Sequence, residues 1–193
     1  MTSVYEVLVG VGTLYIGAAN LAAPATVATV PGVGWTSLGE TDGGVKVTKT
    51  QNIESFTSDQ RTGKMKAVRT EEGLTIETNL NEATLENLAN VINGTVTDTP
   101  AGVGVIGTRA LKLHAGATVT EYALLFRGSS PYGNFPGQFY IPRGYMDDDV
   151  EMEFSKDGKV LIPVKFEALE DLSASTEADR FGVVTYQDAA ATS

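Results

Sequence analysis

The chain has 193 residues, a length typical of one domain, and 42% of them are hydrophobic, which is enough to form a core without cross-links. It contains no cysteine, which excludes disulfides, thiolate metal sites and a cysteine nucleophile. The net charge of −10 and the absence of any prominent lysine and arginine cluster argue against binding to a nucleic-acid backbone.

The N-terminal residues 4–17 favour a strand or a hairpin, with Gly10 and Gly12 at the expected bend. This end lacks the basic stretch of a secretory signal, and Glu6 interrupts its apolar run. No apolar run in the chain approaches the roughly 18 residues that cross a bilayer. We therefore expect a soluble protein that is made in the cytosol and binds no membrane.

Residues 18–44 form a long stretch of low charge, rich in Ala, Thr, Pro and Gly, and they include the only tryptophan, Trp35. Structureless segments longer than about 12–15 residues are uncommon in compact domains unless they have a role or are mobile. We expect this stretch to be an extended arm.

Two β-like runs follow, at 45–59 and 64–80, and Gly63 lies in the turn between them. They predict a long antiparallel hairpin over about 45–80. Its middle is polar on both faces, and only the end near residue 80 separates apolar from polar residues. A hairpin of this kind has little core of its own, so we expect it to project.

Residues 81–93 predict the one clear helix, with Asn81 as its N-cap and Gly94 at its end. Its apolar residues recur at the spacing of one helix face and must pack against a sheet. Two interpretations stay open, namely packing within the subunit alone, or packing that also includes a contact between subunits. The residues concerned are Leu85, Leu88, Ala89 and Ile92.

Four further strands are predicted in the C-terminal half, and the dipeptide Asp157-Gly158 indicates a hairpin between the last two. Between the second and third of them, the aromatic and glycine-rich residues 129–145 favour a packed surface loop. A C-terminal tail, 172–193, follows with one short strand near 181–186. The four strands are expected at residues 108–115, 119–128, 145–157 and 159–171.

Acidic residues recur at every second position along the predicted strand at 145–157, which places them on one face. Three interpretations are open: a solvated polar face, a calcium site or a functional acidic surface. A flat row does not wrap an ion and the EF-hand pattern is absent, so we predict no metal and no cofactor. The candidate acidic residues are Asp147, Asp149, Glu151 and Glu153, together with Glu71, Glu72 and Glu77 of the hairpin.

No catalytic motif withstands inspection. Residues 102–107, GVGVIG, match a dinucleotide-binding pattern in letters, but the required strand before it and helix after it are not predicted. His114 is the only histidine, and no serine lies in a G-x-S-x-G sequence. We therefore predict that the chain is not an enzyme.

The order of these elements resembles that of the tail tube proteins, or major tail proteins, of long-tailed bacteriophages. The residues that carry the resemblance are WTSLGETDGG leading into VKVTKTQNIESFTSDQ, and RTGKMKAVRTEEGLTIETNL running into NEATLENLANVI. The resemblance covers nearly the whole chain. It implies a mainly β fold, an antiparallel β-sandwich or split barrel with one flanking helix, in a single tail tube domain over 1–193.

The resemblance also implies a function. Subunits would form hexameric rings that stack into the tail tube of the virion, a conduit for DNA ejection, after assembly in the host cytoplasm. The implied partners are further copies of the chain, the tape measure protein, and the tail terminator and tail-tip proteins, with DNA passing through unbound. Six copies would carry a charge of about −60, and the acidic candidates would help the wall to repel DNA.

A non-contractile tail is favoured over a sheathed one. Two other classes of function stay open beside the tail tube. One is a different virion module, such as a tail terminator, a decoration protein or an adhesin. The other is a hydrolase that uses two carboxylates held in a cleft.

Overall fold

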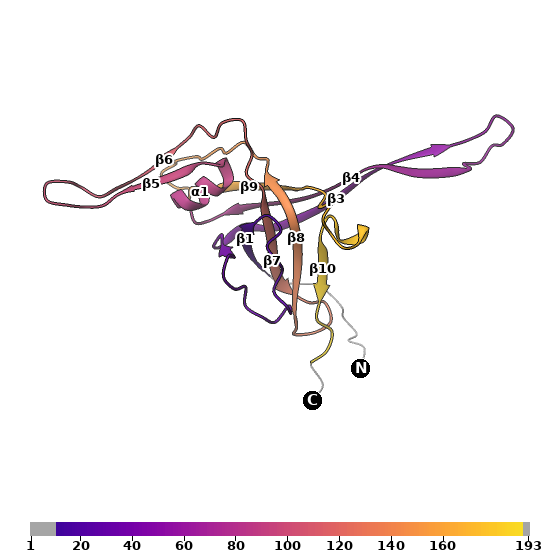
Figure 1. The fold of residues 1–193 in the computed structure, drawn as a ribbon, viewed down its shortest axis with the longest axis horizontal. Helices are drawn as coiled ribbons and strands as arrows, with labels where there is room; N and C mark the ends of the chain where they lie inside the picture. The colour runs from indigo at the N-terminus through magenta and orange to yellow at the C-terminus, as the bar shows by residue number, and fades with distance from the viewer. Residues whose placement is uncertain (1–10, 191–193) are drawn as a thin grey trace.

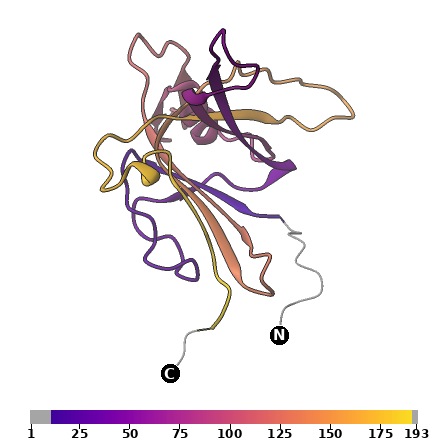
Figure 2. The ribbon, with the colours of Figure 1, turned by 90° about the vertical axis from the view of Figure 1, so that its right-hand side faces the viewer.

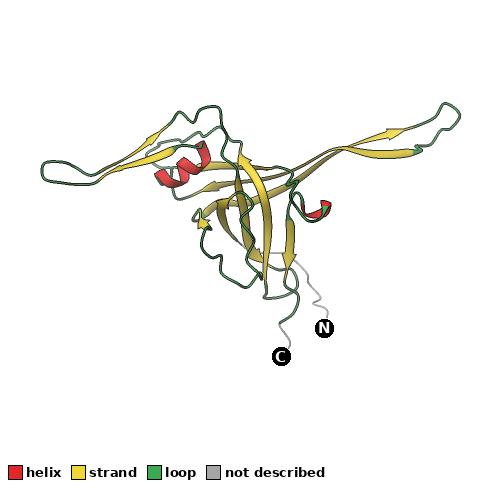
Figure 3. Ribbon diagram, in the orientation of Figure 1, coloured by secondary structure: helices red, strands yellow, loops and turns green. Residues whose placement is uncertain are grey.

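The computed structural model describes residues 11–190, and Figure 1 shows a sheet-built body from which two hairpins project in opposite directions. Strand is the commonest element of the described chain, and one α-helix lies beside the shorter hairpin (Figure 3). The strands are β1 (Thr13–Ala18), β2 (Thr36–Ser37), β3 (Thr41–Phe56), β4 (Lys66–Leu80), β5 (Thr95–Thr99), β6 (Thr108–Lys112), β7 (Tyr122–Ser129), β8 (Pro136–Met146), β9 (Ile162–Ala168) and β10 (Val183–Tyr186). The helices are α1 (Leu85–Ile92) and the 3-10 turn η1 (Glu177–Asp179).

An eight-stranded antiparallel sheet runs in the order β2-β1-β7-β8-β9-β4-β3, with β10 also paired to β8. One edge of β8 carries two partners in succession, β10 along Gly137–Tyr140 and β9 along Gly144–Met146. The sheet therefore divides at β8, and the described strands do not close into a barrel. The predicted mainly β, antiparallel fold with one flanking helix is confirmed.

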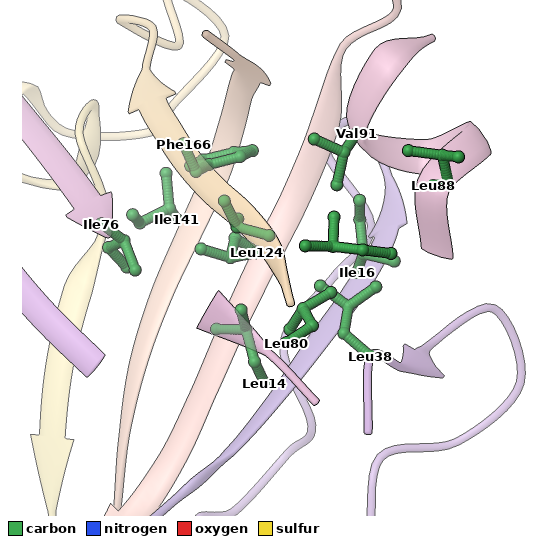
Figure 4. Close-up of a cluster of buried hydrophobic side chains, with 12 residues drawn as sticks. Leu14, Ile16, Leu38, Ile76, Leu80, Leu88, Val91, Leu124, Ile141 and Phe166 are labelled. Carbon is green, nitrogen blue, oxygen red and sulfur yellow. The ribbon is translucent and has the colours of Figure 1, made fainter. Parts of the chain in front are cut away.

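The core lies where α1 covers the curved sheet. Its buried side chains come from β1, β4, β7, β8, β9 and α1, and Figure 4 shows them as one cluster. Phe166, Leu124 and Ile141 are completely or almost completely buried within it. Of the long hairpin, only Ile76 and Leu80 of β4 are fully buried in this cluster, and Val45, Val47 and Leu74 pack against it, whereas the outer part of the hairpin, residues 50–72, contributes nothing to the core.

The long hairpin predicted at about 45–80 is confirmed as β3 and β4. The strands pair from Thr41↔Leu80 out to Phe56↔Lys66, whereas β9 covers the second edge of β4 only over Thr75–Leu80. Beyond that stretch the hairpin is a two-stranded ribbon with no third strand paired to it among the described residues, and it extends away from the body (Figure 1).

The low-charge stretch predicted to span 18–44 is shorter than expected, because β3 already begins at Thr41 and pairs there with β4. Its irregular part folds back onto β8. The Trp35 ring lies edge-on to that of Tyr140, with 6.3 Å between ring centroids, and the Tyr140 hydroxyl donates a 2.9 Å hydrogen bond to the carbonyl oxygen of Leu21. These contacts fasten the stretch to the body.

Both predicted ends of the helix are displaced. The N-cap is Thr84 and not Asn81, and the Thr84 hydroxyl accepts a 3.2 Å hydrogen bond from the Asn87 amide. Asn81 is held at the hairpin base instead, where its backbone amide donates to the Glu40 carbonyl oxygen. At the other end Asn93 takes the left-handed conformation, with φ of 62°, and Gly94 follows it.

The strand predicted at 145–157 and the hairpin at Asp157-Gly158 are wrong. Only residues up to Met146 are strand, and the chain is irregular from there to β9. Conversely, β8 runs through the residues predicted to form a surface loop, 129–145. Its Gly144 is required because a Cβ there would lie 2.5 Å from the Phe166 ring.

The predicted strand near 181–186 is confirmed as β10. The first strand or hairpin, predicted at 4–17, falls partly outside the described residues, and within them β1 begins at Thr13. No helix within 11–190 has the length and apolar character needed to cross a membrane.

Candidate assembly surfaces

The outer part of the β3–β4 hairpin, residues 50–72, is called the arm below. Nearly every residue of the arm is exposed, on both faces of the ribbon. Large apolar side chains nevertheless lie along it, and the Phe56 side chain is 52% exposed. A two-stranded ribbon is at best marginally stable by itself in water, and apolar residues on it favour contact with another chain. The residues concerned are Ile53, Phe56, Met65 and Val68.

Ion pairs neutralise two of the acidic candidates on β4. The Glu72 carboxylate accepts hydrogen bonds from Lys49 Nζ at 2.6 Å and from Arg69 Nη1 at 2.7 Å, and these two cations lower its pKa. Lys46 Nζ likewise donates a 2.6 Å hydrogen bond to the Glu77 carboxylate and lowers the pKa of Glu77. Glu72 and Glu77 are therefore compensated charges rather than a bare negative surface.

Glu71 differs from its neighbours on β4. Its side chain is exposed, and no cation within residues 11–190 forms an ion pair with it. Of the three acidic candidates on the hairpin, Glu71 is thus the one that presents an uncompensated charge.

The acidic row predicted on a strand face does not exist as such. Asp147, Asp149, Glu151 and Glu153 are exposed, but they follow β8 on an irregular segment, where no sheet face aligns them. Lys165 Nζ lies 2.9 Å from the Asp147 carboxylate, and this contact, with a second to Glu167, raises the pKa of Lys165. The described residues hold no group of three or more side chains placed to bind a metal ion.

Helix α1 packs against the sheet of its own subunit through Leu88 and Val91, which belong to the core cluster. Asn87 is buried beside them, and its side-chain amide donates to the carbonyl oxygens of Leu38 and Glu82. Leu88 of the predicted stripe is thus buried, and the pattern missed the buried residues Asn87 and Val91. Because residue 87 is polar, the apolar pattern did not identify it as part of the buried face of the helix.

The other three residues of the predicted stripe are only half-buried. Leu85 and Ala89 lie at the margin of the buried face, and Ile92 packs against the core from its side. The part of each side chain that stays accessible is available to a neighbouring molecule.

The β5–β6 ribbon is a second projecting surface, which the sequence did not predict as a hairpin. Arg109, near the outer end of the paired strands, forms ion pairs with Asp98, at 3.0 Å, and with Glu86 of α1, which tie the ribbon to the helix. At its far end Val103 is fully exposed and Ile106 is 81% exposed. Residues 99–108, called the tip below, contain no charged side chain.

A cleft of about 830 Å³ lies between the base of the β3–β4 hairpin and the segment that contains η1 and β10. Figure 2 shows that segment beside the hairpin base. The charged groups in its lining pair with one another, Lys49 with Glu72 and Arg180 with Glu170 at 2.9 Å. Its apolar lining includes Val47, Leu74, Ile141, Phe181, Val183 and Val184.

A small body with two long ribbons that its own core does not cover is the architecture of a structural protein built to contact other chains. Comparison with known families gives the same result: the family model described as phage tail tube protein matches residues 4–186. The chain belongs to this family of phage tail proteins. No curated protein matches the chain.

Proposed function

We propose that the chain is the repeating subunit of a phage tail tube, and that it assembles into stacked hexameric rings through which DNA is ejected. The observation that carries this proposal is the arm, because its apolar side chains are exposed on both faces and no part of the described chain covers them. Full burial of one such side chain contributes about 1.5–3 kcal/mol. Contact with further copies is the means of obtaining that burial.

The strand edges support closed assembly. The outer edge of β3 has no partner among the described strands, and neither has the second edge of β10. Exposed edges pair readily with other chains, and a ring covers every edge by repeating one contact around an axis. The accessible parts of Leu85, Ala89 and Ile92 support a further contact between α1 and a neighbouring copy.

The charge of the assembly suits the passage of DNA. Each copy has a net charge of −10, so a hexamer carries about −60. The exposed side chains of Glu71, Asp149, Glu151 and Glu153 are the strongest contributors to a negative wall, since no cation within the described residues pairs with them. Repulsion of a polyanion acts over about 10 Å at ordinary ionic strength.

The tube would enclose a tape measure protein and end in terminator and tip proteins, and it would form in the host cytoplasm without membrane or cofactor. A non-contractile tail fits the proposal. The chain itself performs no catalysis in this account, since its task is to form a wall and a conduit.

Sedimentation velocity of the purified full-length chain over a wide concentration range tests this function. We expect hexamers and larger stacked particles whose share grows with concentration. A single closed oligomer that never stacks would favour a tail terminator or a decoration protein. A monomer at every concentration, with or without tape measure protein, would contradict both.

A further inference from the structure

The tip of the β5–β6 ribbon is an apolar projection without a cover. Val103 and Ile106 are almost fully exposed there, and Val105 is 52% exposed. The ribbon has only two strands, and its tip makes no contact with the core cluster. Exposed β-branched side chains at the end of a narrow ribbon favour insertion into an apolar recess.

The cleft beside β10 is a recess with the matching chemistry. Its apolar lining is partly exposed, with Val184 at 49%. Its cations and carboxylates already neutralise each other, through Lys49 with Glu72 and Arg180 with Glu170. An uncharged occupant therefore fits it better than a charged one, because a charge placed there would be desolvated without a partner.

Two strand edges border this cleft and supply backbone partners. The residues of β4 before Thr75 pair with β3 alone, and β10 pairs with β8 alone among the described strands. Their second edges present backbone amides and carbonyl groups to an incoming loop. In the turn at residues 100–107, Gly102 and Val105 bond to each other through their backbones, and the peptide groups of the other residues can hydrogen-bond to such edges.

We propose that the tip of one copy docks into the cleft of a second copy. The two surfaces lie at opposite ends of the molecule, since the tip projects away from the side that carries η1 and the long hairpin (Figure 1). A contact between copies is therefore heterologous, head to tail, and closes into a ring when the rotation between copies allows it. This inference rests on the proposed tube function and gives it a specific contact.

Other projecting segments of the described chain match the cleft less well. The turn of the long hairpin carries Asp59, Arg61 and Lys64, so its burial would desolvate several charges. The loop at 26–34 is uncharged and exposes Val33, but it is fastened to the body, where Arg127 donates a 3.1 Å hydrogen bond to the Thr26 carbonyl oxygen. It projects less far than the ribbon.

Cysteine cross-linking tests the contact directly, because the natural chain has no cysteine. The variants Val103→Cys and Val184→Cys change exposed side chains, so both should fold, as circular dichroism can verify. Mixed and treated with a short bismaleimide, they should give covalent dimers. The double variant should give a ladder of covalent oligomers. The control pair, Val33→Cys with Val184→Cys, should remain monomeric on a denaturing gel.

The possible outcomes separate this contact from the tube function. Tubes in the microscope without a Val103–Val184 cross-link would overturn the docking and leave the function standing. A cross-link confined to the Val33 control pair would assign the cleft to the 26–34 loop and likewise overturn it. A covalent ladder without rings or tubes would support the docking and contradict the function.

Introducing a charge gives a second, independent measurement. Ile106→Asp should weaken association at least tenfold, because the carboxylate enters a cleft whose own charges are already paired. Val33→Asp is the matched control and should leave association within twofold of the natural chain. Equal effects of the two substitutions would overturn the inference.

Discussion

At the scale of single residues, Leu88 links the helix to the sheet. It is 9% exposed and belongs to the same buried cluster as Leu38 and Leu80. Asn87 beside it satisfies its side-chain amide through the Leu38 carbonyl oxygen, so the contact between α1 and the sheet combines apolar packing with a buried hydrogen bond. One side chain thus connects local helix formation with the stability of the body.

We predict that Leu88→Asp unfolds the subunit or lowers its stability by about 3–5 kcal/mol, the range for an uncompensated buried charge. Thermal unfolding followed by circular dichroism measures the change. Leu113→Asp is the control, because this leucine is exposed, and it should shift stability by no more than about 0.5 kcal/mol. A Leu88→Asp protein that melts normally and forms tubes would refute the position assigned to the helix.

The paired carboxylates of β4 predict a pH response. Lys49 and Arg69 lower the pKa of Glu72, and Lys46 lowers the pKa of Glu77. A carboxylate whose pKa falls on folding stabilises the folded state above its unfolded pKa of about 4.3, and that contribution is lost as the pH falls through the folded-state pKa. The contribution is small because both groups are exposed to solvent.

We expect the double variant Glu72→Gln with Glu77→Gln to melt slightly below the natural chain at pH 7, and we expect this difference in melting temperature to be smaller at pH 3, below the unfolded pKa of about 4.3. Calorimetry at both pH values tests this. Glu71→Gln removes a carboxylate without an ion pair, so its melting temperature should equal that of the natural chain at both pH values. A constant difference between the double variant and the natural chain would show that the ion pairs contribute nothing.

At the scale of elements, the sequence predicts those whose pattern is local. The hairpin of β3 and β4 alternates over many residues around one turn, and its polar faces correctly indicate that it projects. Helix α1 has its apolar period and its caps within a dozen residues. Its N-cap is Thr84, because Asn81 is bound at the hairpin base.

The elements that the sequence misses depend on distant partners. Strand β8 contains Pro142, Gly144 and several aromatic residues, which favour a loop when read locally. Its neighbours β7, β9 and β10 make it a central strand, and Phe166 fills the space that a side chain at Gly144 would need. Residues 147–153 alternate like a strand, yet no neighbouring strand pairs with them.

The arm gives a prediction at the same scale. Deleting residues 51–72 and joining Thr50 to Gly73 through an Asn-Gly turn should keep the body folded, because these two residues face each other across the ladder. The melting temperature should change by no more than about 4 °C, equivalent to about 1 kcal/mol, and assembly should be lost. Circular dichroism and sedimentation velocity measure the two effects.

A milder deletion serves as the control for the arm. Replacing only residues 58–63 with the same turn keeps the apolar side chains Phe56 and Met65, and this protein should still assemble. If the larger deletion also assembled normally, the exposed apolar residues of the arm would have no part in contacts between copies.

At the scale of the whole molecule, the outer parts of two projecting hairpins lie outside the core cluster and are not packed against it. Two hairpins point away from each other, strand edges lie open, and the cleft is neutral and apolar within a chain of net charge −10. In an isolated monomer these features leave apolar surface and strand edges exposed to water. In a repeating assembly the neighbouring copies can cover them. Membership of the phage tail tube family agrees with this interpretation.

The proposed function requires that the chain assemble by itself into rings and tubes. Negative-stain electron microscopy of the purified full-length protein can detect both kinds of particle. We predict end views with sixfold symmetry around a central hole, and side views of tubes with a regular axial repeat. Fields of single, uniform particles of monomer size at every protein concentration would contradict the account.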